Sequence, residues 1–423
     1  MGIKKGARTY LIEKLSGNNA DSCIIRKPLS AYKGKRILID YSNISARFAH
    51  RSKNSWGLWG VILEWINFIN KFYFQGIHII VVFDGKPRDE KMPIIEHRIA
   101  IREKAHAKIK QIRDKNLLAS AGDKSDDSAI DSINETDEDT DAILKLRKRA
   151  HSIKTSDIVA SKQLFDIMGV HYIHLEDVDA DSVLKFAIDN NIADACFSGD
   201  MDTIAYGCKH VIQDLDFLKD FVTDINYEKM LEILGVDRDT LLNAFIMSGT
   251  DYNNPLKKTT FAQNLELAKQ YKTIDTVIEN LDAINKRRTE DEQVCVPSRF
   301  DWKTSLEIYN EQLPNETIYA IKLEFTKQLE HSEFLKTKDG YNTLLEYGKK
   351  LLAIKSLNSD DCIKVHKYIR KFEEYVKIRF LHVIKLGMSY QNLKTNIQPR
   401  TRSTESTGIE HKLKPWKLIQ NQT

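Results

Sequence analysis

The sequence predicts an α/β fold in which flanking helices cover a central, mainly parallel sheet, followed by a mostly helical C-terminal part. Two continuous apolar runs, 37–40 and 77–84, each end in a carboxylate. Runs of this kind are typical of parallel strands that are buried on both faces. Segments with helical spacing alternate with them, which is the order expected of crossover helices between parallel strands.

The other expected elements continue this alternation. Helical spacing is present at 56–74, 160–168 and 183–188, and further short strands are expected at 170–175 and 194–197. From residue 231 to about 391 the pattern is mostly helical. The acidic stretch 121–142 is expected to be a disordered insertion, and the tail from 395 onward is expected to be flexible.

Composition excludes several classes without naming a function. The chain has 423 residues, 42% of them hydrophobic, and a net charge of +4, which permits a nucleic-acid partner without requiring one. Its five cysteines form no CxxC motif, so we expect reduced thiols and no zinc site. No apolar run is long enough to span a bilayer, and the first residues lack the apolar core of a signal peptide. We therefore expect an intracellular protein with no membrane partner.

Acidic residues in the expected strand ends and turns carry the chemistry. Taken singly, each is most often a helix cap or a turn residue. Together they could hold two hard cations roughly 3.5–4 Å apart, as hydrolysis of a phosphodiester by two metal ions requires. So many carboxylates would repel one another strongly unless cations lay between them. The set consists of Asp40, Asp84, Asp179, Asp181, Asp200, Asp202 and Asp251.

Four short motifs around these residues carry a resemblance to a known family. They are the strand ending in Asp40, the run Val82–Pro87, the segment Gly199–Asp202 and the segment Ser248–Tyr252. With the first residues of the chain, they resemble the flap endonuclease family of XPG-type 5′ nucleases over roughly residues 1–275, with the arch region replaced. The resemblance implies a PIN-like core, and hydrolysis near single-strand/double-strand junctions of branched, flapped or nicked DNA in replication, repair or recombination.

The resemblance also assigns residues. It implies two Mg²⁺ ions, for which Mn²⁺ may substitute, one held by Asp40, Asp84, Asp179 and Asp181, and the other by Asp200, Asp202 and Asp251. The family's catalytic Lys and Arg correspond to Lys91 and Arg98, which we expect on one helix face. We expect nucleic-acid contacts from Gly2, Arg102, Lys104, Lys257 and Lys258.

The resemblance implies a division of the chain as well. An N-terminal nuclease region (1–114) is followed by the arch with its acidic insertion (115–150). An internal nuclease region with a degenerate helix–hairpin–helix (151–275) is followed by a helical C-terminal region (276–392) and a tail (393–423). We expect a monomer with DNA as its partner. The tail lacks the family's clamp-binding pattern, so binding to a sliding clamp is not supported.

Three departures from the family pattern keep alternatives open. Asp179 and Asp181 stand where Glu is usual, and 257–261 contains no glycine for binding duplex phosphates. Ala46 replaces a stacking tyrosine; Phe48 or Trp56 could substitute, although core packing is the expected role of both. The alternatives are a 5′→3′ RNA exonuclease, a catalytically weak DNA-structure-binding recombination factor, and a smaller toxin-like ribonuclease, which the length disfavours. The eroded loop suggests a large-DNA-virus member, acting in the host cytoplasm, as the alternative to a nuclear protein.

Overall fold

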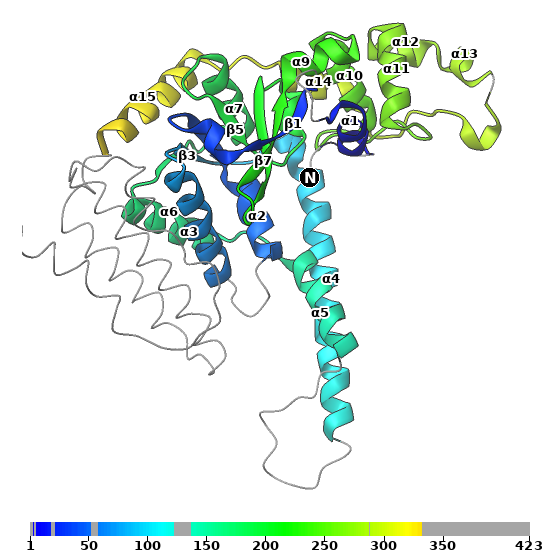
Figure 1. Ribbon diagram of the computed structural model, residues 1–423. Coiled ribbons are helices and arrows are strands. Elements are labelled where there is room, and N and C mark those ends of the chain that lie inside the picture. Colours follow the sequence, from blue (N-terminus) through cyan, green and yellow to red (C-terminus); the bar gives the residue numbers. More distant parts are fainter. Residues whose placement is uncertain are drawn as a thin grey trace, which may run out of the picture.

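Figure 1 shows the computed structural model, in which a seven-stranded sheet is covered by helices and a helical hairpin projects away from it. The structure describes residues 3, 6–17, 22–51, 58–121, 137–286 and 288–331. The strands are β1 (Ile24–Pro28), β2 (Arg36–Asp40), β3 (His78–Phe83), β4 (His171–His174), β5 (Ala195–Phe197), β6 (His210–Asp216) and β7 (Phe221–Asn226).

The helices in chain order are α1 (Ala7–Leu15), η1 (Leu29–Tyr32), α2 (Tyr41–Arg51), α3 (Leu58–Phe74), η2 (Asp89–Lys91), α4 (Met92–Ala121), α5 (Asp137–Ala150), α6 (Thr155–Met168), α7 (Ala180–Asp189), α8 (Asp202–Ala205), α9 (Tyr227–Leu234), α10 (Arg238–Ser248), α11 (Phe261–Tyr271), α12 (Ile274–Glu279), α13 (Leu281–Asn285), η3 (Glu290–Glu292), α14 (Trp302–Asn310) and α15 (Asn315–His331).

The sheet has the strand order β1-β7-β6-β5-β2-β3-β4. The pairs β6–β5, β5–β2, β2–β3 and β3–β4 are parallel, whereas β7 pairs antiparallel with both β1 and β6. The expected central, mainly parallel sheet with flanking helices is therefore confirmed. Parallel strands place their carboxyl ends along one edge, which is where ligands bind in open α/β sheets.

Both faces of the central strands are buried, as their continuous apolar runs predict. Along β2, Ile37 and Ile39 belong to the cluster under α2, α3 and α6, while Leu38 belongs to the cluster under α1, α7, α10 and α11. The first cluster is rich in rings, with Trp65 stacked on Tyr41 at a centroid distance of 5.6 Å. Phe48 is 3% exposed and packs edge-on against Trp65, which agrees with the core role expected for it.

The antiparallel strands β1, β6 and β7 were not among the expected elements. In β6 and β7, polar residues at buried positions interrupt the apolar pattern that indicates a strand. Gln213 in β6 and Asp224 in β7 are both buried. A buried carboxylate is tolerated within a strand only when partners satisfy it. Tyr32 and His210 hydrogen-bond to Asp224, and Lys27 forms an ion pair with it.

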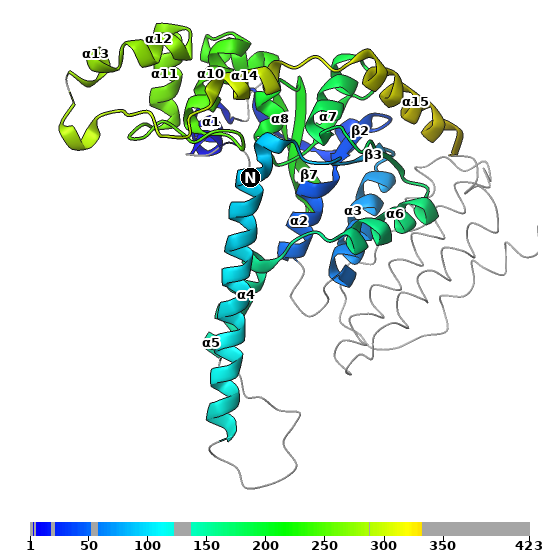
Figure 2. The ribbon, with the colours of Figure 1, turned by 180° about the vertical axis from the view of Figure 1, so that it is seen from behind.

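The helical hairpin corrects one expectation. We expected 121–142 to be disordered, but α5 begins at Asp137, so residues 137–142 are helical. Ile143 and Ala150 of α5 pack on Ala105 and Ile109 of α4, which gives this helix an apolar seam to bury. The 30-residue α4 extends about 45 Å at the usual helical rise. Figures 1 and 2 agree that it begins beside the sheet and runs away from it.

The chain after β7 is helical as far as the structure describes it, as expected. None of the described helices combines the length and apolar character needed to cross a bilayer. Among the described cysteines, Cys23, Cys196, Cys208 and Cys295 are free thiols. Residues 332–423, which include the expected tail, and residues 122–136 of the acidic insertion lie outside the described part.

Asp224 makes the antiparallel strands sensitive to acid. Burial alone would raise the pKa of Asp224, but the hydrogen bonds and charges of its partners outweigh burial and lower it. A carboxyl group whose pKa is lower in the folded state stabilises the fold above its unfolded pKa of about 3.9, and this stabilisation is lost as pH falls through the folded pKa.

We therefore predict that Asp224→Asn lowers the free energy of unfolding by about 2 kcal/mol at pH 7, because charge-assisted hydrogen bonds are lost. Urea unfolding from pH 7 down to pH 3 should show the gap between wild type and variant closing below about pH 4. The control Asp239→Asn, at a side chain that is 78% exposed, should leave stability nearly unchanged. A gap that stays constant with pH would contradict the role of the Asp224 charge.

Candidate active site

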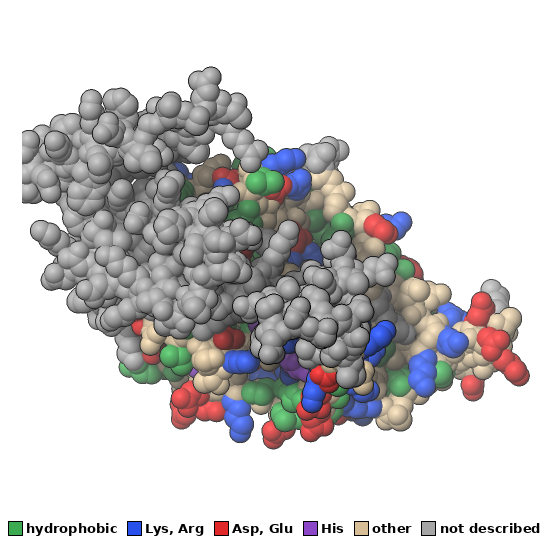
Figure 3. Space-filling model, turned by 90° about the horizontal axis from the view of Figure 1, so that it is seen from below, with side chains coloured by type: hydrophobic (Ala, Val, Ile, Leu, Met, Phe, Trp, Pro, Cys, Tyr) green, Lys and Arg blue, Asp and Glu red, His purple; other side chains and the backbone are tan. Residues whose placement is uncertain are grey.

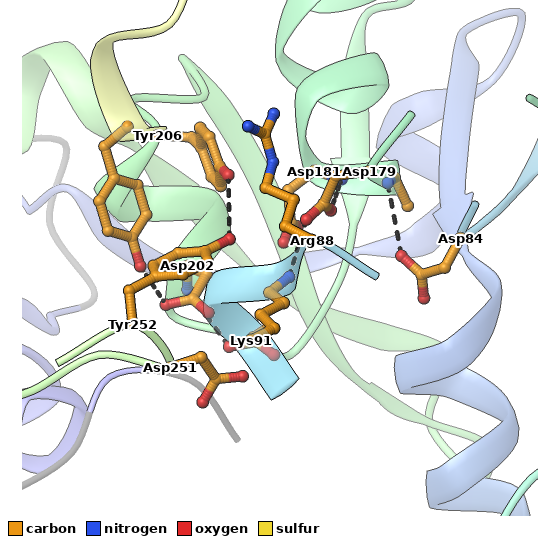
Figure 4. A network of polar contacts seen from close by, with 12 residues as sticks. Asp84, Arg88, Lys91, Asp179, Asp181, Asp202, Tyr206, Asp251 and Tyr252 are labelled. Atoms are coloured by element: carbon orange, nitrogen blue, oxygen red, sulfur yellow. Dashed lines mark hydrogen bonds and ion pairs between the residues drawn. The ribbon is translucent and has the colours of Figure 1, made fainter. Parts of the chain in front are cut away.

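The seven carboxylates come from five loops or strand ends and gather at one edge of the sheet. Asp40 ends β2, and Asp84 directly follows β3. Asp179 and Asp181 lie at the start of α7. Asp200 follows β5, Asp202 begins α8, and Asp251 follows α10. Figure 4 shows Asp84, Asp179, Asp181, Asp202 and Asp251 around Lys91. The local reason is topological, since parallel strands deliver their C-terminal residues to a common edge.

Gly85 brings two of these segments together. A Cβ atom at residue 85 would lie 2.4 Å from the carbonyl oxygen of Leu175 and 2.7 Å from that of Val178. The backbone N–H of Gly85 donates to the Val178 carbonyl at 3.0 Å. Only glycine permits this approach, which places Asp84 next to the start of α7. The Ala180 N–H accordingly faces the Asp84 carboxylate at 3.4 Å.

Ser198 and Asn43 hold the loop after β5 against the end of β2. The Ser198 hydroxyl donates to Asp40 Oδ2 at 2.8 Å and accepts from the Asp200 N–H at 3.1 Å. The Asn43 N–H donates to Asp40 Oδ1 at 3.0 Å, and its side-chain oxygen accepts from the Gly199 N–H at 2.9 Å. Both Asp40 oxygens are therefore held, so Asp40 is fixed relative to Asp200.

Gly249 and Asn253 shape the loop that carries Asp251. Gly249 has φ of +91°, and a Cβ atom there would lie 2.8 Å from the ring of Pro255. The Thr250 hydroxyl donates to Asn253 Oδ1 at 2.7 Å, and the Asn253 amide donates to the Ile246 carbonyl at 3.0 Å. The loop is thereby fastened to the end of α10, and Asp251 is 7% exposed.

Burial, reinforced by mutual repulsion, raises the pKa values of the carboxyl groups in the site. Burial, followed by the charge of Asp84, raises the pKa of Asp40 to about 7. Burial and the carboxylates of Asp179, Asp40 and Asp200 raise the pKa of Asp181 well above its usual range.

The other carboxylates respond in the same direction. Burial, with Asp200 and Asp251 close by, raises the pKa of Asp202 well above its usual range. Burial and Asp251 also raise the pKa of Asp200. Asp84 lies at the mouth of the site with one side in solvent, yet the protein packed around its carboxyl group and the charge of Asp179 raise its pKa too. The charged cluster is therefore unfavourable without added positive charge.

Lys91 and Arg98 supply positive charge from the chain itself. The Lys91 ammonium lies 2.7 Å from Asp179 Oδ2, and the Arg98 guanidinium lies 2.8 Å from both oxygens of Asp251. Burial would lower the pKa of Lys91, but the charges of Asp179 and Asp181 and the hydrogen bond to Asp179 together outweigh burial and raise the pKa, so the ammonium stays protonated. Lys91 lies in η2, before α4 begins, so the expected single helix face for both cations is wrong. Both side chains nevertheless reach the carboxylates.

The donor set has the chemistry of a magnesium or manganese site. Hard divalent cations take oxygen ligands, and these carboxylates are oxygen donors that repel one another. Within the described ranges, no three Asp, Glu, His or Cys side chains form a group that could hold a metal ion in their present positions. Two of the carboxylates are ion-paired with Lys91 and Arg98. The oxygen donors of these residues suit divalent cations. A bound cation would take the place of Lys91 or Arg98 beside Asp179 or Asp251.

The residues expected to contact nucleic acid are more widely separated than the carboxylates. Arg102 lies one turn beyond Arg98 on α4, whereas Lys104 lies roughly 240° round the helix from Arg98. Lys257 and Lys258 are exposed in the loop between α10 and α11. Lys258 has φ of +60°, a conformation for which glycine would be favoured. Gly2 lies outside the described residues.

Several residues in the site were missed by sequence reasoning. Tyr309 of α14 donates to Asp202 Oδ1 at 3.0 Å, and Arg88 forms an ion pair with Glu311 beside the site. Lys91 lies 5.4 Å from the ring centroid of Tyr252. No local pattern marks the hydroxyl of Tyr309. Ser198, by contrast, directly precedes the Gly199–Asp202 motif, which could have singled it out.

We predict that Asp181→Asn stabilises the metal-free protein by about 1 kcal/mol, because it removes a repelling charge whose pKa is raised by its neighbours. Asp194→Asn is a control of opposite sign, since Lys35 and the Arg36 N–H bind Asp194 and its pKa is lowered despite partial burial. Chemical unfolding in EDTA at pH 7 measures both variants. Destabilisation by Asp181→Asn would contradict this prediction, because it would show that positive charge in the folded protein already offsets the repulsion between Asp181 and its neighbouring carboxylates.

The comparisons with known proteins agree with this geometry. The XPG I-region family model matches residues 170–251, the stretch that contains five of the seven carboxylates. Flap endonuclease 1-A of Sorghum bicolor is 26% identical over 81% of this chain and 83% of its own length. Flap endonuclease 1 of Tetrahymena thermophila is 23% identical over 73% of this chain and 76% of its own length.

A solved structure shows the same fold. The Holliday junction-resolving enzyme GEN1, in complex with product DNA and Mg²⁺, matches with a TM-score of 0.53 at 15% identity, covering 88% of this chain and 79% of that one. The matched I-region and the flap endonuclease relatives show that this chain is similar in sequence to XPG-type flap endonucleases, and the GEN1 structure shows that it shares their fold.

Proposed function

We propose that this protein is a structure-selective 5′ nuclease that hydrolyses phosphodiesters near single-strand/double-strand junctions of branched, flapped or nicked DNA. The observation that carries the proposal is the convergence of seven carboxylates with Lys91 and Arg98 where α4 leaves the sheet. The flap endonuclease relatives support a nuclease, and the GEN1 structure supports DNA with a divalent cation as its ligands.

The carboxylates are proposed to hold two Mg²⁺ or Mn²⁺ ions. Asp40, Asp84, Asp179 and Asp181 form one group, and Asp200, Asp202 and Asp251 form the other. Bound there, the ions would supply an activated water nucleophile and neutralise negative charge on the phosphodiester. The held oxygens of Asp40 and the capping position of Asp179 restrict the carboxylates before any substrate arrives.

Lys91 and Arg98 are proposed to bind and orient the scissile phosphate. Each is ion-paired with a carboxylate oxygen, and a phosphate oxygen is a chemically equivalent acceptor. Exchange of one acceptor for the other would place both positive charges where negative charge develops during hydrolysis. Arg102, on the same side of α4 as Arg98, would continue the path of the strand along the helix.

The described part of the face shown in Figure 3 favours selection by shape over a strong general attraction for nucleic acid. On the face shown in Figure 3, Lys and Arg side chains are interspersed with Asp and Glu. A mixed surface creates no large field of one sign. Lys257 and Lys258, exposed in the loop between α10 and α11, would contact the duplex through its phosphates.

We predict that Asp200→Asn abolishes cleavage of an end-labelled 5′-flap. Lys91→Ala and Arg98→Ala should each lower kcat by about 10²–10³, as expected when a donor to developing charge is removed. Lys185→Ala, which removes a cation from α7 paired with Asp189 instead of with the site, should leave kcat unchanged.

The substrates are 5′-flap, nicked and blunt duplex DNA and matched RNA, each with Mg²⁺, Mn²⁺ or EDTA. Undiminished cleavage by Asp200→Asn would exclude its proposed role. Preferential cleavage of RNA would replace the DNA nuclease by a 5′→3′ RNA exonuclease. Tight binding of branched DNA without cleavage would indicate a DNA-structure-binding factor.

The loop before α11 generates a separate prediction. Replacing both Lys257 and Lys258 by Ala should weaken duplex binding and reduce the slope of log K against log salt by about 2, because two phosphate contacts are lost. The double Lys→Arg variant keeps the charges and should keep the slope. Binding is measured by fluorescence anisotropy at salt concentrations from about 50 to about 200 mM. An unchanged slope in the Ala variant would place the duplex elsewhere.

A further inference from the structure

Helix α14 reaches the carboxylate cluster from a region to which the sequence assigned no role. The Tyr309 hydroxyl donates to Asp202 Oδ1 at 3.0 Å, across 107 residues of chain. Tyr309 is 1% exposed and Asp202 is 4% exposed, so the contact is protected from solvent. The Tyr309 ring packs edge-on against Tyr206 at 4.8 Å and against Tyr252 at 5.7 Å between centroids.

We propose that Tyr309 is a positioning residue that fixes the rotation of the Asp202 carboxylate for binding a divalent cation. This inference rests on the nuclease function proposed above and adds a residue to its site. Tyr309 itself touches neither the substrate nor the cation in this proposal. It acts through Asp202.

The first argument concerns the carboxylate. Rotation of an Asp carboxylate about χ2 is broad, so packing around Cβ does not by itself fix the direction of its oxygens. A hydrogen bond from a buried hydroxyl to Oδ1 selects one rotation and leaves Oδ2 directed elsewhere. Hydrogen bonds to an ionised acceptor are stronger than those between neutral groups, so this restraint is substantial. Ligating carboxylates in metal sites are generally held by such outer partners.

The second argument concerns how firmly Tyr309 is held. Arg238, at the start of α10, donates to the Tyr309 carbonyl at 2.9 Å and also to the side chain of Asn310. Ser305, one turn earlier in α14, donates to Asn253 Oδ1 at 3.2 Å. Asn253 belongs to the loop of Asp251, so one helix is fastened to the segments of both Asp202 and Asp251.

The third argument concerns the end of α14. Glu311, which directly follows the helix, forms an ion pair with Arg88, three residues before Lys91. The C-terminal end of α14 therefore contacts an acidic residue of the site through Tyr309 and the basic segment 88–91 through Glu311. A hydroxyl carried on a helix that is braced at several points can set an angle more accurately than one on a free loop.

The test compares two variants that each lose one buried tyrosine–aspartate hydrogen bond. Tyr309→Phe keeps the ring and its packing but removes the donor to Asp202. Tyr32→Phe removes the matching donor to Asp224, a buried carboxylate outside the site. Both variants are made in the full chain, and thermal unfolding is measured for each in EDTA.

Calorimetric titration with Mn²⁺ in the absence of DNA gives a readout that does not depend on turnover. We expect Tyr309→Phe to weaken Mn²⁺ binding about 10-fold, as other losses of outer partners do, and Tyr32→Phe to leave it unchanged. In flap cleavage, the Mn²⁺ concentration that gives half the maximal rate should rise by a similar factor in Tyr309→Phe alone. Saturating Mn²⁺ should then restore the rate.

Two outcomes would overturn the inference while leaving the proposed function standing. One is a wild-type protein that binds Mn²⁺ and cleaves flaps, with Mn²⁺ affinity unchanged in Tyr309→Phe. The other is a loss of rate in Tyr309→Phe that no concentration of Mn²⁺ restores, with equal losses in Tyr32→Phe, which would show a structural role. If the wild-type protein neither binds Mn²⁺ nor cleaves any flap, the proposed function itself fails and the inference fails with it.

Discussion

Repulsion among carboxylates at one edge of the sheet is the constraint on which the structure of the site depends. The fold cannot bury Asp40, Asp181, Asp200 and Asp202 and place them so close together without raising the pKa values of their side chains. Lys91 and Arg98 offset part of this cost by pairing with Asp179 and Asp251. The negative charge of the cluster is therefore only partly neutralised by the chain, as is common where a ligand brings positive charge.

The surrounding fold supplies the rigidity that such a cluster needs. Apolar residues fill both faces of β2 and β3, and Gly85 and Gly249 allow loops to approach more closely than any side chain would permit. Ser198 and Asn43 then fix Asp40 on two sides. Helix α14 extends this framework, since its contacts join the segments of Asp202, Asp251 and Arg88. The region beyond residue 280 is thus part of the site.

Local sequence patterns predicted the parts of the structure that depend on local order. The strand ends at Asp40 and Asp84 follow from continuous apolar runs, and parallel topology then brings their carboxylates to one edge. β6 and β7 could not be predicted in this way, because Asp224 resembles a loop residue until Tyr32, far away in the sequence, and His210, on the neighbouring strand, are seen to satisfy it. The start of α5 was missed for a similar reason, since its apolar seam has meaning only against α4.

The candidate site shows the same division. All seven carboxylates were named from motif order and spacing and from the family resemblance, and the resemblance alone assigned Lys91 and Arg98. The ion pairs between the cations and carboxylates were not foreseen, since spacing gives positions without giving partners. Tyr309 was also missed, because a hydrogen bond across 107 residues leaves no periodic trace.

The central claim is that the carboxylates form an incompletely neutralised cluster that receives divalent cations. Thermal unfolding of the full-length protein at pH 7, in EDTA and then with increasing Mn²⁺, tests it most directly. The account predicts that the Tm rises steadily with the Mn²⁺ concentration, because binding to the folded state alone stabilises it. It also predicts that the rise is lost when Asp181 and Asp202 are both replaced by Asn. A Tm that does not respond to Mn²⁺, or that rises equally in the double variant, would contradict the account.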